Sequence, residues 1–243
     1  GNPCRNIPAI QVAGTNGKGS ITSFIESLSI ERGIKVGVST SPHLTSWCER
    51  IRVNGKAISE PEIKQRIIKL KSFIEVQKLT PFELIITTAF DYFEELKVDL
   101  LILEVGLGGR LDATTIHPLR PIVAMATIGL DHCEYLGNDL NKIAKEKAAV
   151  ITQRATVISA KQAPVVEKVL KERASQKEAK IKWVEPIPKD WKLGLPGNFQ
   201  RKNAAVAKGA AEALADLGWE INESSLRQGM ADASWPGRLE KAK

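Results

Sequence analysis

Apolar runs separated by amphipathic stretches follow one another along the chain. The apolar runs cover residues 9–14, 34–40, 98–105, 121–129 and 155–161. Strands with one face in water alternate apolar and polar residues, whereas strands that are apolar almost throughout are typical of sheets covered on both faces. The five runs therefore predict parallel strands packed between two layers of helices.

The stretches between these runs carry helix signals. Capping-box pairs open two of the helices, Ser59 with Glu62 and Thr80 with Glu83. We expect helices over residues 20–33, 59–77, 80–96, 138–151 and 198–218. Alternating strands and helices predict an α/β fold of the P-loop type, with a mainly parallel sheet and helices on both faces. Residues 180–197, with three prolines and two tryptophans, are interpreted as a small antiparallel excursion.

Composition excludes several classes of protein. The 243 residues are 43% hydrophobic and 26% charged, which is ordinary for a globular chain of one large or two small domains. The net charge is +7, but the lysines and arginines are mixed with acidic residues along the chain. We therefore expect an anionic small molecule rather than nucleic acid as the partner. Cys4, Cys48 and Cys133 fit neither a disulfide framework nor a zinc site. We expect a cytoplasmic monomer that does not enter membranes. An organelle remains an alternative location, because the chain begins with Gly1 and its N-terminus is compatible with trimming.

Residues 12–20, VAGTNGKGS, resemble a phosphate-binding loop but depart from the usual G-x-x-x-x-G-K-[ST] pattern. The stretch lies between a predicted strand and a predicted helix. In that setting backbone N–H groups and the positive end of the helix dipole point at one spot, to which Lys18 adds a cation. Glycines would let a phosphate approach the backbone closely. The alternative is a plain strand-to-helix turn with a solvated lysine.

Polar side chains follow the other predicted strands, at the sheet edge where ligands bind in open parallel sheets. These residues are Ser41, His43, Glu49, Arg50, Glu104, Arg110, Asp112, Asp131 and His132. A carboxylate directly after a buried strand is costly unless it is paired, so we interpret Glu104 as a magnesium ligand rather than a turn cap. His132 fits a ligand and a structural histidine equally well. By spacing alone Lys145 and Lys147 would be solvated, and we assign His117 no role.

Taken together, the motifs resemble one family. VAGTNGKGS, TSPHL, ERIRVNG, EVGLGGRLDAT, IGLDHCEYLG, IAKEKAAV and PGRLE occur in the order found in folylpolyglutamate synthases and dihydrofolate synthases. These enzymes belong to the Mur-ligase-like ATP-dependent amide ligases. Each motif alone is weak, but the ordered set is specific and spans almost the whole chain. The resemblance implies that the shortened loop with Gly19 after Lys18 is this family's ATP site.

The resemblance also implies roles for individual residues. The ATP phosphate loop would be formed by Gly14, Thr15, Asn16, Gly17, Lys18, Gly19 and Ser20. Ser41, Glu104 and His132 would ligate magnesium, and Lys147 matches the family lysine that carries a carbamate and helps to hold a second metal ion. Lys18, Glu104, His132 and Lys147 would be catalytic. Asn203 and Arg238 match positions that contact ATP, and TSPHL would lie near the pterin-bearing substrate.

The implied activity is the ATP-dependent joining of glutamate to a dihydropteroate or folate carboxylate. The chain departs from the family at Thr115, Ala149 and Phe199, where Asn, Gly and His are more usual, and Phe199 weakens the adenine-side assignments. Family members continue into a second α/β domain that binds glutamate, so residues 1–243 look like the ATPase domain alone. The alternatives are a Mur ligase acting on a UDP-sugar and a nucleotide-binding module without catalysis.

Overall fold

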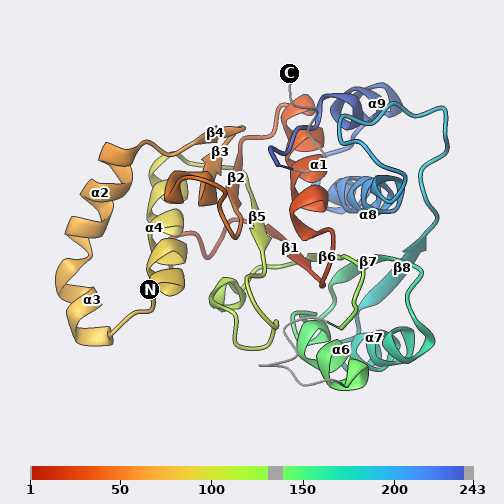
Figure 1. The fold of residues 1–243 in the computed structure, drawn as a ribbon, viewed down its shortest axis with the longest axis horizontal. Coiled ribbons are helices and arrows are strands. Elements are labelled where there is room, and N and C mark those ends of the chain that lie inside the picture. Colours follow the sequence, from red (N-terminus) through yellow and green to blue (C-terminus); the bar gives the residue numbers. More distant parts are fainter. Residues whose placement is uncertain (1, 131–138, 238–243) are drawn as a thin grey trace.

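The residues that the structure describes form an eight-stranded sheet that runs through the molecule (Figure 1). The computed structural model describes residues 2–130 and 139–237. Strand order across the sheet is β4-β3-β2-β5-β1-β6-β7-β8. The strands are β1 (Ala9–Ala13), β2 (Val36–Ser39), β3 (Ile51–Val53), β4 (Lys56–Ala57), β5 (Leu100–Glu104), β6 (Ile122–Met125), β7 (Thr156–Ala160) and β8 (Lys180–Val184). All neighbouring pairs are parallel except β2 with β3 and β3 with β4, which are antiparallel.

Helices cover both faces of this sheet (Figure 1). The helices are α1 (Lys18–Glu31), α2 (Glu60–Lys69), α3 (Lys71–Gln77), α4 (Pro81–Glu95), α6 (Leu140–Ala148), α7 (Pro164–Gln176), α8 (Gln200–Glu212) and α9 (Glu223–Asp232). Short 3-10 turns are η1 (Trp47–Arg50), η2 (Ala113–Ile116) and η3 (Ala213–Leu217). Helices α1, α8 and α9 pack together on one face, whereas α4 and the α6–α7 pair lie on the other.

The strand residues divide between these layers by alternation. On β5, Leu100 and Ile102 belong to the core under α1 and α8, whereas Leu101 and Leu103 belong to the core under α4. All four side chains are completely buried. Because successive side chains of a strand point to opposite faces, a strand between two helix layers must be apolar at every position. This requirement explains the unbroken apolar runs in the sequence.

The structure confirms the α/β fold, the mainly parallel sheet and the five expected strands. The antiparallel part is at a different place from the one expected: residues 180–184 form the parallel edge strand β8, and the antiparallel strands are β3 and β4. The helix expected over residues 59–77 is divided at Leu70, whose N–H bonds to the carbonyls of Arg66 and Ile67. Both capping boxes form as expected. No helix in the described ranges combines the length and hydropathy needed to cross a membrane.

Candidate functional site

The predicted phosphate loop (residues 14–20), called the phosphate loop below, joins the central strand β1 to α1. Gly14 and Gly17 have φ angles of 129° and 102°, a region that favours glycine. A Cβ on Gly14 would lie 2.6 Å from the Cβ of Ala126, so no larger residue fits against β6 there. The backbone N–H groups of Thr15 and Asn16 donate to the carbonyl of Thr127, at 2.8 and 3.1 Å. The loop is therefore a compact structure fixed to the end of β6.

Lys18 folds back over this loop. Its Nζ donates to the carbonyl oxygens of Gly14, at 3.2 Å, and Thr15, at 3.3 Å. Within the described part of the chain, no side chain caps the start of α1, and the first turn holds no acidic residue. The positive end of α1 and the Lys18 ammonium thus act at the same loop, which is an arrangement suited to an anion. This geometry favours a phosphate site over the plain turn.

Glu104 and Lys147 are both buried beside the loop, each with 3% of its surface exposed. Glu104 ends β5 and is paired in register with Val12, two residues before Gly14. Lys147 on α6 donates from Nζ to the carbonyl of Gly14 at 3.0 Å. The expectation from spacing that Lys147 is solvated is therefore wrong, whereas Lys145 is exposed as expected. The reason is tertiary: α6 packs so closely on residues 105–112 that a Cβ on Gly109 would lie 3.1 Å from the Cα of Lys147.

Asn203, from α8, lies on the other side of the loop. A Cβ on Gly17 would be 2.4 Å from the Oδ1 of Asn203, which places the amide directly against the loop. Asn203 donates to Gln200 at 2.9 Å, and Gln200 donates to the Oγ of Ser20 at 3.1 Å. Sequence reasoning gave Gln200 no role. Its neighbour Phe199 is 59% exposed and marks the solvent side of this network.

The loop after β2, residues 40–50, is organised by Glu49. Its carboxylate accepts hydrogen bonds from the backbone N–H groups of Leu44, Ser46 and Thr45, at 2.7 to 2.9 Å. The bonds from Leu44 and Ser46 contribute most to a pKa of Glu49 lowered to about 2. Nε of Arg50 donates to Nδ1 of His43 at 2.8 Å. These three polar residues therefore shape their own loop, which we call the β2 loop.

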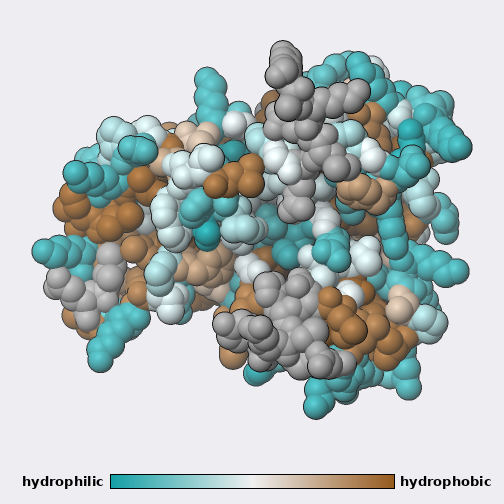
Figure 2. Space-filling view, in the orientation of Figure 1, coloured by the Kyte–Doolittle hydropathy of each residue, from teal (hydrophilic) through white to brown (hydrophobic). Residues whose placement is uncertain are grey.

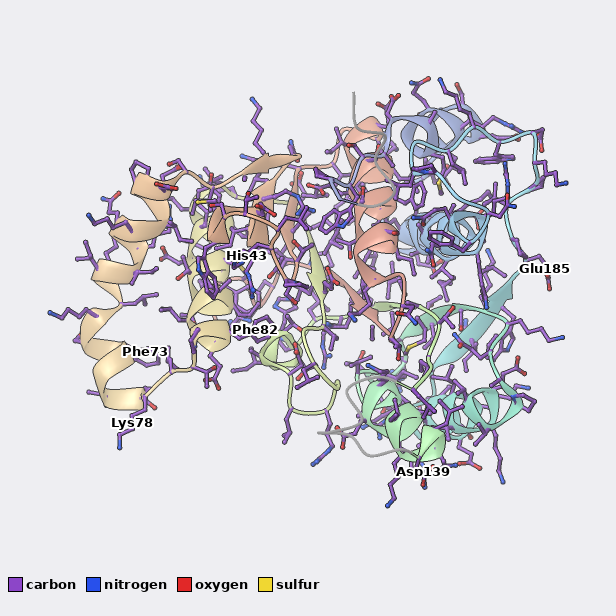
Figure 3. The ribbon with its side chains drawn as sticks, in the orientation of Figure 1. His43, Phe73, Lys78, Phe82, Asp139 and Glu185 are labelled. Atoms are coloured by element: carbon purple, nitrogen blue, oxygen red, sulfur yellow. The ribbon has the colours of Figure 1, made fainter. Side chains whose placement is uncertain are left out.

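Ser41 lies in the β2 loop, two residues after the end of β2, and is half-buried. Because Ser39 pairs in register with Leu103, the β2 loop leaves the sheet at the same edge as Glu104. Figure 3 shows His43 above Phe82, the second residue of α4, in the region between α4 and the centre of the molecule. A Cβ on Gly106 would meet the ring of Phe82 at 2.7 Å, so this ring packs against the loop after β5.

Other polar residues at this edge have structural partners. Asp112 accepts hydrogen bonds from the backbone N–H groups of Gly106 and Leu107 and from the Oγ1 of Thr114, which closes the loop after β5. Arg110 pairs with Glu146 of α6 at 3.0 Å. His117 is buried and its Nε2 lies 2.8 Å from the carbonyl oxygen of Ile7. Burial lowers the pKa of His117.

The structure thus brings residues 14–20, Glu104, Lys147 and Asn203 together. Asp131, His132 and Arg238 lie outside the described residues. Among residues 2–130 and 139–237, no group of three or more His, Cys, Asp or Glu side chains could hold a metal ion. Figure 2 shows hydrophilic side chains gathered in the middle of the face viewed, between the side of α2 and α4 and the side of α1 and α8.

The chain matches known proteins along its length. The model of the Mur ligase middle domain matches residues 12–182. The dihydrofolate synthase/folylpolyglutamate synthase of Bacillus subtilis is 36% identical over 272 aligned residues, which cover 99% of this chain and 63% of that protein. A structure of Mycobacterium tuberculosis folylpolyglutamate synthase complexed with ADP and AMPPCP superposes with a TM-score of 0.88 at 30% identity. That match covers 98% of this chain and 61% of the other.

Escherichia coli FolC in complex with DHPP and ADP superposes with a TM-score of 0.85 at 32% identity. The match covers 97% of this chain and 59% of that one. The chain spans less than two thirds of the length of each of these three proteins. It therefore belongs to the folylpolyglutamate synthase and dihydrofolate synthase family and contains the Mur ligase middle domain.

Proposed function

We propose that the full-length protein is an ATP-dependent ligase that joins glutamate to the carboxylate of a dihydropteroate or a folate. Residues 1–243 would be its ATP-binding domain. The observation that carries the proposal is the phosphate loop, with Lys18 folded over it and buried Glu104 and Lys147 beside it. Related structures contain AMPPCP with folate, or ADP with DHPP, which supports the same classes of ligand here.

The nucleotide would bind between the phosphate loop and the start of α8. Gly14, Thr15, Asn16, Gly17, Gly19 and Ser20 would form the loop around its phosphates. The N–H groups of Thr15 and Asn16 are bonded to Thr127, so the donors to the phosphates would be the N–H groups at the start of α1. Lys18 would turn from the Gly14 and Thr15 carbonyls to the phosphate charge. Asn203 lies against Gly17 and would contact the nucleotide. Arg238, outside the described residues, is assigned to ATP by the family motif alone.

Buried Glu104 fits a magnesium ion, because a carboxylate at the strand end next to a phosphate site is a hard oxygen ligand. Ser41 and His132 would complete the protein ligands, and bound magnesium would supply positive charge to the transferring phosphoryl group. Lys147 would be carbamylated when its neutral amine adds to carbon dioxide and loses a proton. The product would carry one negative charge shared by two oxygens, which would hold a second metal ion, and its remaining N–H can keep the bond to Gly14.

In the proposed reaction the acceptor carboxylate attacks the terminal phosphorus of ATP, ADP leaves, and an acyl phosphate forms. The amine of glutamate then attacks the acyl carbon, phosphate leaves with the electrons of the broken C–O bond, and the amine loses a proton. Lys18 and the N–H groups of the phosphate loop would orient the phosphates and offset their charge. Residues beyond this chain would bring in glutamate.

The test is incorporation of labelled glutamate by the full-length protein with ATP and one of three acceptors. Dihydropteroate and tetrahydrofolate distinguish addition of the first glutamate from addition of later ones. Turnover with either acceptor is the expected result. Turnover with a UDP-sugar acceptor alone would instead make the protein a Mur ligase of cell-wall type. Binding of ATP without turnover on any acceptor would make it a nucleotide-binding module.

A further inference from the structure

One guanidinium group joins three segments of the chain next to the phosphate loop. Arg52 of β3 pairs with Glu26 of α1 at 2.6 Å, and the two side chains are only 11% and 9% exposed. Its Nη1 donates to the Oγ1 of Thr40 and to the carbonyl of Glu49, both at 3.1 Å. Its carbon Cζ lies 5.0 Å from the ring centroid of Trp235. Arg52 thus links α1, both ends of the β2 loop, and the segment that follows α9.

Trp235 extends this link to the phosphate loop itself. A Cβ on Gly19 would lie 3.1 Å from Cε2 and Cζ2 of Trp235, so the edge of the indole rests on the loop backbone. The Oγ of Ser23 donates to the carbonyl of Ser234 at 2.8 Å. On the other side, a Cβ on Gly237 would lie 2.8 Å from a methyl carbon of Leu44. The exit segment (residues 233–237) is therefore held between α1 and the β2 loop.

These contacts give Trp235 a position between two parts of the proposed site. We propose that Trp235 is a positioning residue for the metal-bound nucleotide, because it holds the β2 loop, which carries Ser41, against the phosphate loop. This inference rests on the proposed function, in which Ser41 ligates magnesium and the phosphate loop binds ATP. Magnesium demands nearly ideal octahedral geometry, so Ser41 on the β2 loop must keep a set distance from a nucleotide held on the phosphate loop. A nucleotide without metal needs the phosphate loop alone.

Trp235 is a better test position than Arg52. Removing the guanidinium would leave Glu26 buried without its partner, which is strongly destabilising whatever the role of Arg52. Trp235→Ala leaves the Arg52–Glu26 pair in place, and Trp235→Phe keeps an aromatic ring. The matched control is Trp183→Ala. Trp183 on β8 is also half-buried, and the Nζ of Lys171 lies 5.7 Å from its ring centroid. It lies at the far edge of the sheet from β2.

The measurement is calorimetric binding of AMPPCP to the full-length protein, with magnesium and with EDTA. Loss of the indole contacts should weaken magnesium–AMPPCP binding by about tenfold in Trp235→Ala and by less in Trp235→Phe. Metal-free AMPPCP should change less than about threefold, and Trp183→Ala should alter neither affinity. Equal weakening with and without magnesium, or no change in either, overturns the inference. Lys18→Ala separates the two proposals, since unchanged affinity in that variant counts against the nucleotide site itself.

A second readout needs no nucleotide. Amide hydrogen exchange of the unliganded protein should become faster in Trp235→Ala both in residues 15–20 and in the β2 loop, because Trp235 contacts one and is joined to the other through Arg52. Trp183→Ala should leave both segments unchanged. If exchange increases in neither segment, or in only one of them, Trp235 does not hold the two loops together.

Discussion

At the scale of the residue, single side chains fix the loops around the candidate site. The carboxylate of Glu49 accepts hydrogen bonds from three backbone N–H groups of its own loop. The carboxylate of Asp112 accepts hydrogen bonds from two backbone N–H groups in the loop after β5. Such bonds satisfy donors that no sheet or helix can satisfy, and at Glu49 they favour the ionised carboxylate. The β2 loop is therefore expected to depend on the charge of Glu49.

The pKa of Glu49, lowered to about 2, predicts how stability changes with pH. A carboxyl group whose pKa is lower in the folded state stabilises that state above its unfolded pKa and loses this effect as pH falls through the folded value. We expect the melting temperature of the wild type to exceed that of Glu49→Gln by a constant margin at neutral pH. The margin should shrink between about pH 4.5 and pH 2. A margin independent of pH would show that the β2 loop does not lower the pKa of Glu49.

Glu104→Gln in the full-length protein tests the proposed metal ligand. Glutamine keeps the shape of the side chain but is a much poorer ligand for magnesium than a carboxylate. We expect turnover to fall by at least about a hundredfold at limiting magnesium, with a smaller change in acceptor binding. Steady-state kinetics over a magnesium titration give both values. Turnover close to that of the wild type would make Glu104 a structural residue of the β5 end.

At the scale of the element, local sequence signals determined some boundaries and tertiary contacts determined others. The capping boxes at Ser59 and Thr80 and the apolar runs of the central strands could be predicted, since each depends on neighbouring residues. The edge strand β8 could not, because it is only half-buried and its lysines break the apolar pattern. Strands β3 and β4 have three and two residues, too few for a periodic signal.

The site was predictable to a similar extent. The phosphate loop has a sequence signature, so its position between β1 and α1 follows from the chain itself. The burial of Lys147 and the approach of Asn203 to Gly17 depend on how α6 and α8 pack, and only the family resemblance pointed to them. Gln200 and Trp235 had neither signal. Both act through contacts with residues far away in the sequence.

The helix caps give a test at this scale. In Thr80→Ala the first turn of α4 loses its cap, and we expect the unfolding free energy to fall by about 1 kcal/mol. Ser59→Ala should have a smaller effect on global unfolding, because α2 buries only Ile63 and Arg66 and lies at the periphery (Figure 1). Denaturant titration measures both. The control is Thr87→Ala, the same chemical change within α4, which should alter stability by less than about 0.5 kcal/mol. Equal losses in all three variants would contradict the assignment to capping.

At the scale of the whole molecule, the chain has a sheet covered by helices on both faces, but it spans less than two thirds of the length of the three relatives described above. In the described residues, the sheet and a helix layer on each of its faces surround the phosphate loop (Figure 1). Amide formation also needs a site for glutamate and the exclusion of water from the acyl phosphate. We therefore expect this chain to bind a nucleotide but to show almost no ligase activity.

The 243-residue chain alone should bind magnesium–ATP weakly and incorporate almost no glutamate. Adding the remainder of the full-length protein, fused or as a separate domain, should restore some synthesis if the interface forms again. The assay compares glutamate incorporation with dihydropteroate and with tetrahydrofolate. Turnover by the isolated chain that equals the full-length protein would show that this one domain is sufficient.

If residues 14–20 bind the phosphates of a nucleotide, removing the Lys18 ammonium should weaken that binding, and calorimetry with Lys18→Ala measures the loss. Lys69→Ala, an exposed lysine of α2, is the matched control. Magnesium–AMPPCP should bind the wild type and Lys69→Ala with equal affinity. Binding to Lys18→Ala should weaken by about a hundredfold or more, with an unchanged far-ultraviolet spectrum and melting temperature. Equal affinity of all three proteins for the nucleotide would show that residues 14–20 do not bind its phosphates through Lys18.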